Sequence, residues 1–158
     1  MKATVNPRRF RQVIDYVAVG VAVITVDSGG VTHAAPAAGL SFVQAELPMI
    51  VVTLERSAPV CQAVCIERRF ALSVLACDQA DVLGEVLAAD AMSTGIARPA
   101  NGDGAELPFV EDAAAHLDCR VVNWMGAFSH RVILAELQAA ETFDRGALVC
   151  FRGELTTL

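Results

Sequence analysis

Residues 20–75 read GVAVITVDSGGVTHAAPAAGLSFVQAELPMIVVTLERSAPVCQAVCIERRFALSVL, and this stretch decides the fold. It opens with Val21–Val26, a run rich in β-branched residues that predicts a strand. The turn signal Ser28-Gly29-Gly30 follows, and Val31 begins a return strand. We therefore expect a β-hairpin at the start of the stretch.

The rest of the stretch predicts a loop, two more strands and a short helix. Residues 33–39, HAAPAAG, are small and broken by proline, which predicts a loop whose backbone something approaches closely. Beyond the AELP turn, the predicted elements are a strand over Met49–Leu54, a short helix over Ala58–Arg68 and a buried strand over Phe70–Leu75.

The flanking segments add helices, strands and one long loop. Asn6-Pro7 is a good helix start, and this helix is expected to end near Gly20. Its apolar positions are Phe10, Val13, Ile14 and Val17. The later elements are a helix over Asp78–Ala89 with Val82, Leu83, Val86 and Leu87 inward, a surface loop or lid over Ala91–Glu106, and strands over Leu117–Trp124, Ser129–Leu137 and Ala147–Arg152. The pattern predicts one domain over residues 1–158, mainly β with helices, and of barrel type.

Composition and charge bound the possible partners. Hydrophobic residues make up 54% of the 158 residues, and mean hydropathy is +0.48. We therefore expect a homodimer in which the second copy covers apolar surface. The alternative is a monomer with an unusually large hydrophobic core. A net charge of −6 with scattered basic residues argues against nucleic acid. No run of about eighteen apolar residues occurs, so we expect no membrane span. The N-terminus lacks a signal-peptide pattern, which makes the cytoplasm the expected compartment.

The cysteines do not form a metal-binding motif. There are five of them, with no CxxC, and Cys61 and Cys65 are four apart and would share one helix face. A zinc site needs more ligands at suitable spacing, and the three histidines do not cluster with these cysteines in sequence. We expect no metal and predict that most of the five are buried free thiols.

The ordered motifs of the chain resemble those of the flavin reductase-like family, the FMN-binding split barrels. The similar segments are FRQVIDYVAVGVAVITV (10–26), AELPMIVVTLERSAPV (45–60), FALSVLACDQADV (70–82) and LPFVEDAAAHLDCRVV (107–122). Ser129-His130 falls where the family has G-D-H, and Cys119 falls at its common buried cysteine. Each motif alone is weak, but their order covers nearly the whole chain.

The resemblance implies a Greek-key split barrel that dimerises and binds FMN or FAD at the subunit interface. It implies that NAD(P)H reduces the flavin, often to serve a separate flavin-dependent monooxygenase. His130 is the candidate catalytic residue, because the family's histidine lies beside the flavin and an imidazole can act as acid or base. The candidate cofactor-binding residues are Pro36, Ala37, Ala38, Gly39, Ser41, Thr53, Leu54, Glu55, Arg56, Ser57 and Val60.

The flavin-phosphate site departs from the family pattern. The family's T-A-N-S-F becomes PAAGL at residues 36–40, and its S-R-T becomes Ala58-Pro59-Val60. Each hydrogen bond lost to a charged phosphate costs about 1.5–3 kcal/mol. Arg56, Arg68 and Arg69 are nearby cations that could compensate in part, or they are solvated surface residues. The isoalloxazine ring needs only backbone groups and apolar contacts, so a ligand without a phosphate suits this chemistry better than FMN.

Three functions remain open. The first is an NAD(P)H-dependent flavin reductase that uses flavin as a loosely held substrate or binds FAD differently, as the reductase component of a two-component monooxygenase. The alternative is a repurposed split barrel that has lost FMN and acts as a cofactor-free enzyme or binder of an apolar small molecule. The third is a non-catalytic subunit that binds an oxygenase.

Three further residues each have two possible interpretations. His33 faces the pocket or sits in a turn, Trp124 stacks on a ligand or belongs to the core, and Phe128 fills the nicotinamide space or points outward.

Overall fold

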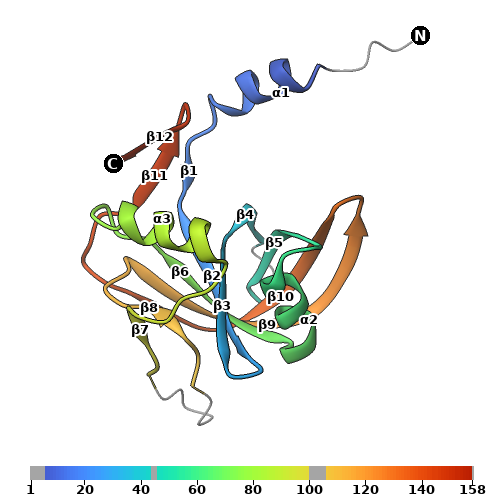
Figure 1. Ribbon diagram of the computed structural model, residues 1–158, viewed down its shortest axis with the longest axis vertical. Coiled ribbons are helices and arrows are strands. Elements are labelled where there is room, and N and C mark those ends of the chain that lie inside the picture. The colour runs from blue at the N-terminus through green and yellow to red at the C-terminus, as the bar shows by residue number, and fades with distance from the viewer. Residues whose placement is uncertain (1–5, 44–45, 100–105, 158) are drawn as a thin grey trace.

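The architecture is a curled antiparallel sheet with helices packed on it and an arm formed near the two ends of the chain (Figure 1). The computed structural model describes residues 6–43, 46–99 and 106–157. The main sheet has seven strands in the spatial order β3-β2-β6-β9-β10-β5-β4, and each neighbouring pair is antiparallel. These strands are β2 (Ala22–Ser28), β3 (Val31–Pro36), β4 (Ala38–Val43), β5 (Met49–Glu55), β6 (Arg69–Val74), β9 (Ala115–Ala127) and β10 (His130–Thr142).

The two edge strands of this sheet are consecutive in the chain. β3 ends at Pro36 and β4 begins at Ala38, so Ala37 alone joins the two edges. A flat sheet would hold its edges far apart, and the sheet therefore curls until they meet at this corner. The Ala37 N–H donates to the Ala22 carbonyl at 2.8 Å, which ties the corner to β2.

The predicted hairpin at the start of the chain is confirmed. Ser28 pairs with Val31 across Gly29 and Gly30. Both glycines have positive φ, as a two-residue hairpin turn of this kind requires. The first five residues of β2 are buried, in agreement with the β-branched pattern.

The predicted loop over residues 33–39 is wrong, because this segment completes β3 and begins β4. Ala34 and Ala35 are buried, and their small side chains let β3 pack closely against α2 (Pro59–Glu67) and α3 (Ala80–Ala89). Pro36 is tolerated because β3 is an edge strand, where a missing N–H breaks no second ladder.

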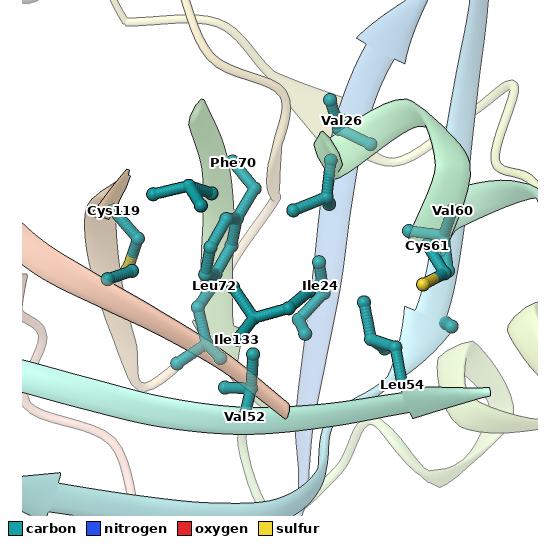
Figure 2. Packing of buried hydrophobic residues seen from close by; sticks show 14 of the residues in the cluster. Ile24, Val26, Val52, Leu54, Val60, Cys61, Phe70, Leu72, Cys119 and Ile133 are labelled. Carbon is teal, nitrogen blue, oxygen red and sulfur yellow. The ribbon is translucent and has the colours of Figure 1, made fainter. Parts of the chain in front are cut away.

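The main core lies between the inner face of the sheet and α2, whose prediction is confirmed. Figure 2 shows Val60 of α2 in one cluster with Ile24, Leu54, Phe70 and Ile133 of the strands. Burial of side chains of this size stabilises a fold by roughly 1.5–3 kcal/mol each. This packing fixes the start of α2 against the end of β5.

A second core cluster lies on the other face of β2 under α3. It joins Val23 of β2 with Val86 of α3, while Ile24 belongs to the first cluster, so alternate residues of β2 are buried on opposite faces. The prediction that Leu87 points inward is wrong, since it is exposed. The predicted loop over 91–106 contains β7 (Ile96–Ala97), which pairs with β8 (Phe109–Val110). Residues 100–105 of that loop lie outside the described residues.

The arm consists of α1 (Pro7–Ile14), β1 (Val19–Gly20), β11 (Leu148–Phe151) and β12 (Glu154–Thr157), and Figure 1 shows it standing away from the main sheet. α1 begins at Pro7 as expected but ends at Ile14, six residues before Gly20, because β1 must pair with β11. Every residue of α1 is exposed, including the apolar Val13 at 65%. The sequence did not predict β12, whose residues are mostly polar.

All five cysteines are free, but only two are buried. Cys61 and Cys119 lie in the core, Cys65 and Cys150 are half-buried, and Cys77 is exposed, so the prediction of mostly buried thiols is wrong. Burial raises the pKa of both Cys61 and Cys119. Among the helices in the described ranges, none has the length and apolar character needed to span a membrane.

Candidate functional site

The candidate site lies where the end of β5 and the β9–β10 hairpin meet the start of α2. In the ladder between β5 and β10, Glu55 is opposite His130. In the ladder between β5 and β4, Thr53 is opposite Ala38. β5 is therefore the centre of the site, with the catalytic candidate on one side and the small residues of β4 on the other.

A bulge in β4 shapes one side of this site. The register shifts between Ala38 and Ser41, so β4 carries one residue more than β5 across this segment. Gly39 lies in the bulge with φ +61°, and a Cβ there would stand 2.8 Å from Thr53 Oγ1. Bulges of this type bring backbone groups out of the ladder and are frequent beside binding sites. The glycine is thus required by both the backbone and the close approach of Thr53.

The hairpin tip is tied to the start of α2. The Arg56 N–H donates to the Ser129 carbonyl at 2.9 Å, and Arg56 Nη1 lies 3.5 Å from the Phe128 carbonyl. His130 is exposed, and its Nδ1 is 2.9 Å from Ser129 Oγ. The hydroxyl contact orients the imidazole, so that Nε2 points away from Ser129.

Residues of the turn from β5 into α2 form hydrogen bonds with one another. Ser57 Oγ donates to Glu55 Oε1 at 2.7 Å, and the Ala58 N–H donates to the Glu55 carbonyl at 3.1 Å. Ala58 is the N-cap of α2 and supplies no side-chain cap, and Pro59 follows it. The start of α2 therefore has no side-chain cap, and the Glu55 carboxylate bonds to the turn that precedes the helix.

The structure divides the predicted binding residues by exposure. Gly39, Ser41, Glu55, Arg56 and Ser57 are exposed, and Thr53 is half-buried. Leu54 and Val60 are core residues, so they could reach a ligand only through their backbones. Pro36 and Ala37 line a separate apolar groove of about 250 Å³ with residues of β1, α3 and the C-terminal strands.

The other predicted cations are engaged elsewhere. Arg69 Nε donates to Asp118 Oδ1 at 2.9 Å, in an ion pair whose carboxylate is buried. Arg68 donates to the carbonyls of Val121 and Val122, and its guanidinium lies 5.0 Å from the centre of the Trp124 ring. Arg56 is therefore the cation closest to the start of α2 among the three.

Three further candidates are placed by the structure. His33 pairs with Val26 on edge strand β3 and is not opposite any residue of β5 or β10. Trp124 is half-buried against the main core. Phe128 occupies the hairpin tip with φ +54° and is fully exposed in the single chain.

Two further features of the structure were not predicted from the sequence. Arg131 Nη1 donates to Cys65 Sγ at 3.0 Å, and this hydrogen bond raises the pKa of Arg131. His116 is buried, donates from Nε2 to the Val110 carbonyl at 2.8 Å and stacks on Phe109 at 4.5 Å. Burial lowers the pKa of His116. Both arrangements join residues of different strands or helices, so only the tertiary fold could reveal them.

Comparison with known proteins gives one consistent family. The model of the flavin reductase like domain family matches residues 14–158. The reductase component of a 4-nitrophenol 4-monooxygenase/4-nitrocatechol 2-monooxygenase from Rhodococcus opacus is 28% identical over 144 residues, 91% of this chain and 77% of the relative. An NADH:riboflavin 5′-phosphate oxidoreductase from Streptomyces pristinaespiralis is 27% identical over 149 residues, 90% of this chain and 82% of the relative.

A solved structure of the same kind superimposes on nearly the whole chain. It is BorF, the flavin reductase component of a bacterial two-component tryptophan halogenase, with a TM-score of 0.84 and 27% identity. The match covers 97% of this chain and 98% of BorF. The curled sheet, the helices and the arm are therefore shared as one arrangement.

Proposed function

The chain belongs to the flavin reductase like domain family, and on this basis we propose that it transfers a hydride from NADH or NADPH to FMN or FAD. The observation that carries the proposal is the family match over residues 14–158, which includes every element of the candidate site. Its relatives include a monooxygenase reductase component and an NADH-dependent oxidoreductase of riboflavin 5′-phosphate.

The β4 bulge fits the ring of a flavin. Gly39 has no side chain to block a flat ligand, and the bulge takes backbone N–H and C=O groups out of the ladder with β5. Thr53 adds a hydroxyl at the same place. A flat, largely apolar ring is held well by such a surface with a few placed polar groups.

The start of α2 does not fit a firm hold on a flavin phosphate. Pro59 has no N–H, the Ser57 hydroxyl is bonded to Glu55, and Ala58 and Val60 carry no polar side chain. Helix starts bind phosphate through free N–H groups and hydroxyls, which are scarce here. We therefore propose that flavin is a substrate that enters and leaves.

The chain's own part in the reaction is binding, orientation and proton handling. The bound flavin supplies a ring that can accept the hydride, and the nicotinamide supplies the hydride. His130, oriented by Ser129, is the residue placed to hold or move a proton at Nε2 or to pair with an anionic group of a ligand. Thr53 and the backbone around Gly39 orient the ligand against β5.

We further propose that the chain folds as one domain over residues 1–158, a Greek-key split barrel, and that it acts as a homodimer. The support for dimerisation is uncovered apolar surface. Phe10, Val13 and Val17 on and beside α1 are exposed, as are Met125 and Phe128 on the β9–β10 hairpin. A second copy would bury such side chains, which seldom gather on the surface of a monomer without a reason.

We propose a flavin-dependent monooxygenase as the partner and the cytoplasm as the compartment. The Rhodococcus opacus relative is itself the reductase component of a monooxygenase, which supports the partner. The free state of all five cysteines suits a reducing compartment.

The test is oxidation of NADH and NADPH by the purified protein with FMN, FAD or riboflavin. We expect oxidation that depends on added flavin. Absence of oxidation with all three flavins and both nicotinamides would overturn the proposed function. The variant His130→Ala should lower kcat by about 10²-fold, the lower end of the range for acid–base groups.

A further inference from the structure

The turn from β5 into α2 carries a carboxylate close to the place where a phosphate would need positive charge. Glu55 is exposed at the end of β5, opposite His130 in the ladder. The Glu55 carboxylate accepts a hydrogen bond from the Ser57 hydroxyl at 2.7 Å, so this hydroxyl is not available to donate to a phosphate. A negative charge near a helix start occupies the position that would otherwise attract an incoming anion.

Most backbone N–H groups of the turn also donate hydrogen bonds within the protein already. The bonds are Arg56 N–H to the Ser129 carbonyl at 2.9 Å, Ala58 N–H to the Glu55 carbonyl at 3.1 Å and Cys61 N–H to the Ala58 carbonyl at 3.0 Å. Pro59 contributes no donor at all. Among residues 56–61, this leaves the N–H groups of Ser57 and Val60 for a ligand, and Val60 is itself buried.

The charge at the turn is balanced before any ligand arrives. Arg56 brings one positive charge, and Glu55 brings one negative charge on the adjacent residue. The Arg56 guanidinium lies toward the hairpin tip, 3.5 Å from the Phe128 carbonyl. A phosphate entering here would therefore meet a neutral turn with few free donors.

We propose that, because of Glu55, this site recognises the flavin ring and not the phosphate, so that riboflavin is bound about as tightly as FMN. The inference rests on the proposed function, because it assumes that a flavin occupies the β4–β5 surface. Riboflavin and FMN differ only in the phosphate, and the Glu55 carboxylate offsets the attraction that Arg56 would otherwise exert on it. In water the charge of Glu55 is worth a factor of about two to five in affinity at low ionic strength and less in higher salt.

The first experiment titrates the full-length wild-type protein with riboflavin and with FMN, followed by flavin fluorescence. We expect the two dissociation constants to agree within about threefold, because the charges of Glu55 and Arg56 largely offset each other at the turn. FMN binding that is tenfold tighter than riboflavin binding would overturn the inference, since it would require a working phosphate site.

The second experiment compares Glu55→Gln with Glu67→Gln. Glu67 lies at the other end of α2, where its Oε1 accepts the Ser28 hydroxyl at 2.7 Å, so its variant removes the same charge away from the turn. Glu55→Gln should favour FMN over riboflavin by about two- to fivefold at low ionic strength, and the gain should shrink with added salt. An equal effect of both variants, or none from either, would contradict the role of Glu55.

Failure of the inference and failure of the proposed function are separable. If neither flavin binds, or if bound flavin is not reduced by NADH or NADPH, the proposed function fails. If both flavins are reduced but FMN binds tenfold more tightly, the function stands and the inference fails. Circular dichroism of each variant confirms that the sheet is intact before the affinities are compared.

Discussion

Gly39 combines two constraints at one position, a positive φ and a neighbour standing where a side chain would begin. Its φ is +61°, and a Cβ would lie 2.8 Å from Thr53 Oγ1 and 3.3 Å from Thr53 Cβ. Gly39→Ala should therefore lower the free energy of unfolding by about 1–3 kcal/mol. Urea unfolding measures this loss, and flavin titration of the same variant should show weaker ring binding.

Gly84 is the matched control for this substitution. It lies inside α3, and a Cβ there would have open space. Gly84→Ala should stabilise the protein by roughly 0.5–1 kcal/mol, since alanine favours a helix over glycine. Two Gly→Ala changes with the same sign would contradict the account of the bulge.

His116 is expected to make stability depend on pH. Burial lowers its pKa in the folded protein, so below pH ~6.5 the unfolded chain takes up a proton that the folded chain resists. Stability should fall as pH drops from about 6.5 and level off once the folded state is also protonated. His116→Gln keeps an N–H donor for the Val110 carbonyl and should flatten this slope in urea unfolding. An unchanged slope would assign the effect to other groups.

The resemblance to the family picks out residues 53–60 and His130 as candidates for the site, but the sequence does not predict their contacts. The structure brings these residues together, with His130 opposite Glu55 in the ladder, and their roles stay predictions. The bond from Ser57 to Glu55 depends on turn geometry that several side chains allow. Arg69 looked available as a cation because its partner, Asp118, lies 49 residues away in sequence.

At the scale of secondary structure, the ion pair between Arg69 and Asp118 joins β6 to β9. Asp118 is only 3% exposed and Arg69 is 22% exposed, so removing the charge of the carboxylate weakens an ion pair that water screens little. Asp118→Asn should cost about 3 kcal/mol or more in the free energy of unfolding. Chemical denaturation of the two proteins at one pH gives the difference.

The exposed pair between Asp27 and Arg98 provides the comparison. Its two side chains are 41% and 40% exposed. Asp27→Asn should cost less than about 1 kcal/mol, because water already screens this pair. If both substitutions cost the same, burial is not what makes the Asp118 pair important.

Elements with strong local patterns were predictable, and those fixed by packing were not. The hairpin turn at Gly29-Gly30 and the α2 helix follow from short-range chemistry, and both are confirmed. Residues 33–39 became strands because a curled sheet needs small side chains at its corner, although alanine and proline are poor strand formers. β12 is polar and exists because β11 offers it a free edge.

At the scale of the whole molecule, the arm sets the expected oligomeric state. The apolar face of α1 is not buried against any of the residues that the structure describes, which supports the proposed homodimer. Val13→Asp should shift the protein toward a monomer of 16.7 kDa in light scattering. Arg8→Gln, on the opposite face of α1, should leave the mass unchanged, and a monomer for wild type would contradict the proposal.

The corner at Ala37 is also a place where the chain could be cut without breaking the strand pairing of the main sheet. β3 and β4 are neighbours in the chain but share no ladder, because they are the two outer strands of the sheet. A break beside Ala37 would cut a covalent tether and leave all six strand ladders of the main sheet intact. Fragments ending at Ala37 and starting at Ala38 are therefore suited to a split reporter, in which reassembly of the two fragments restores a complete sheet.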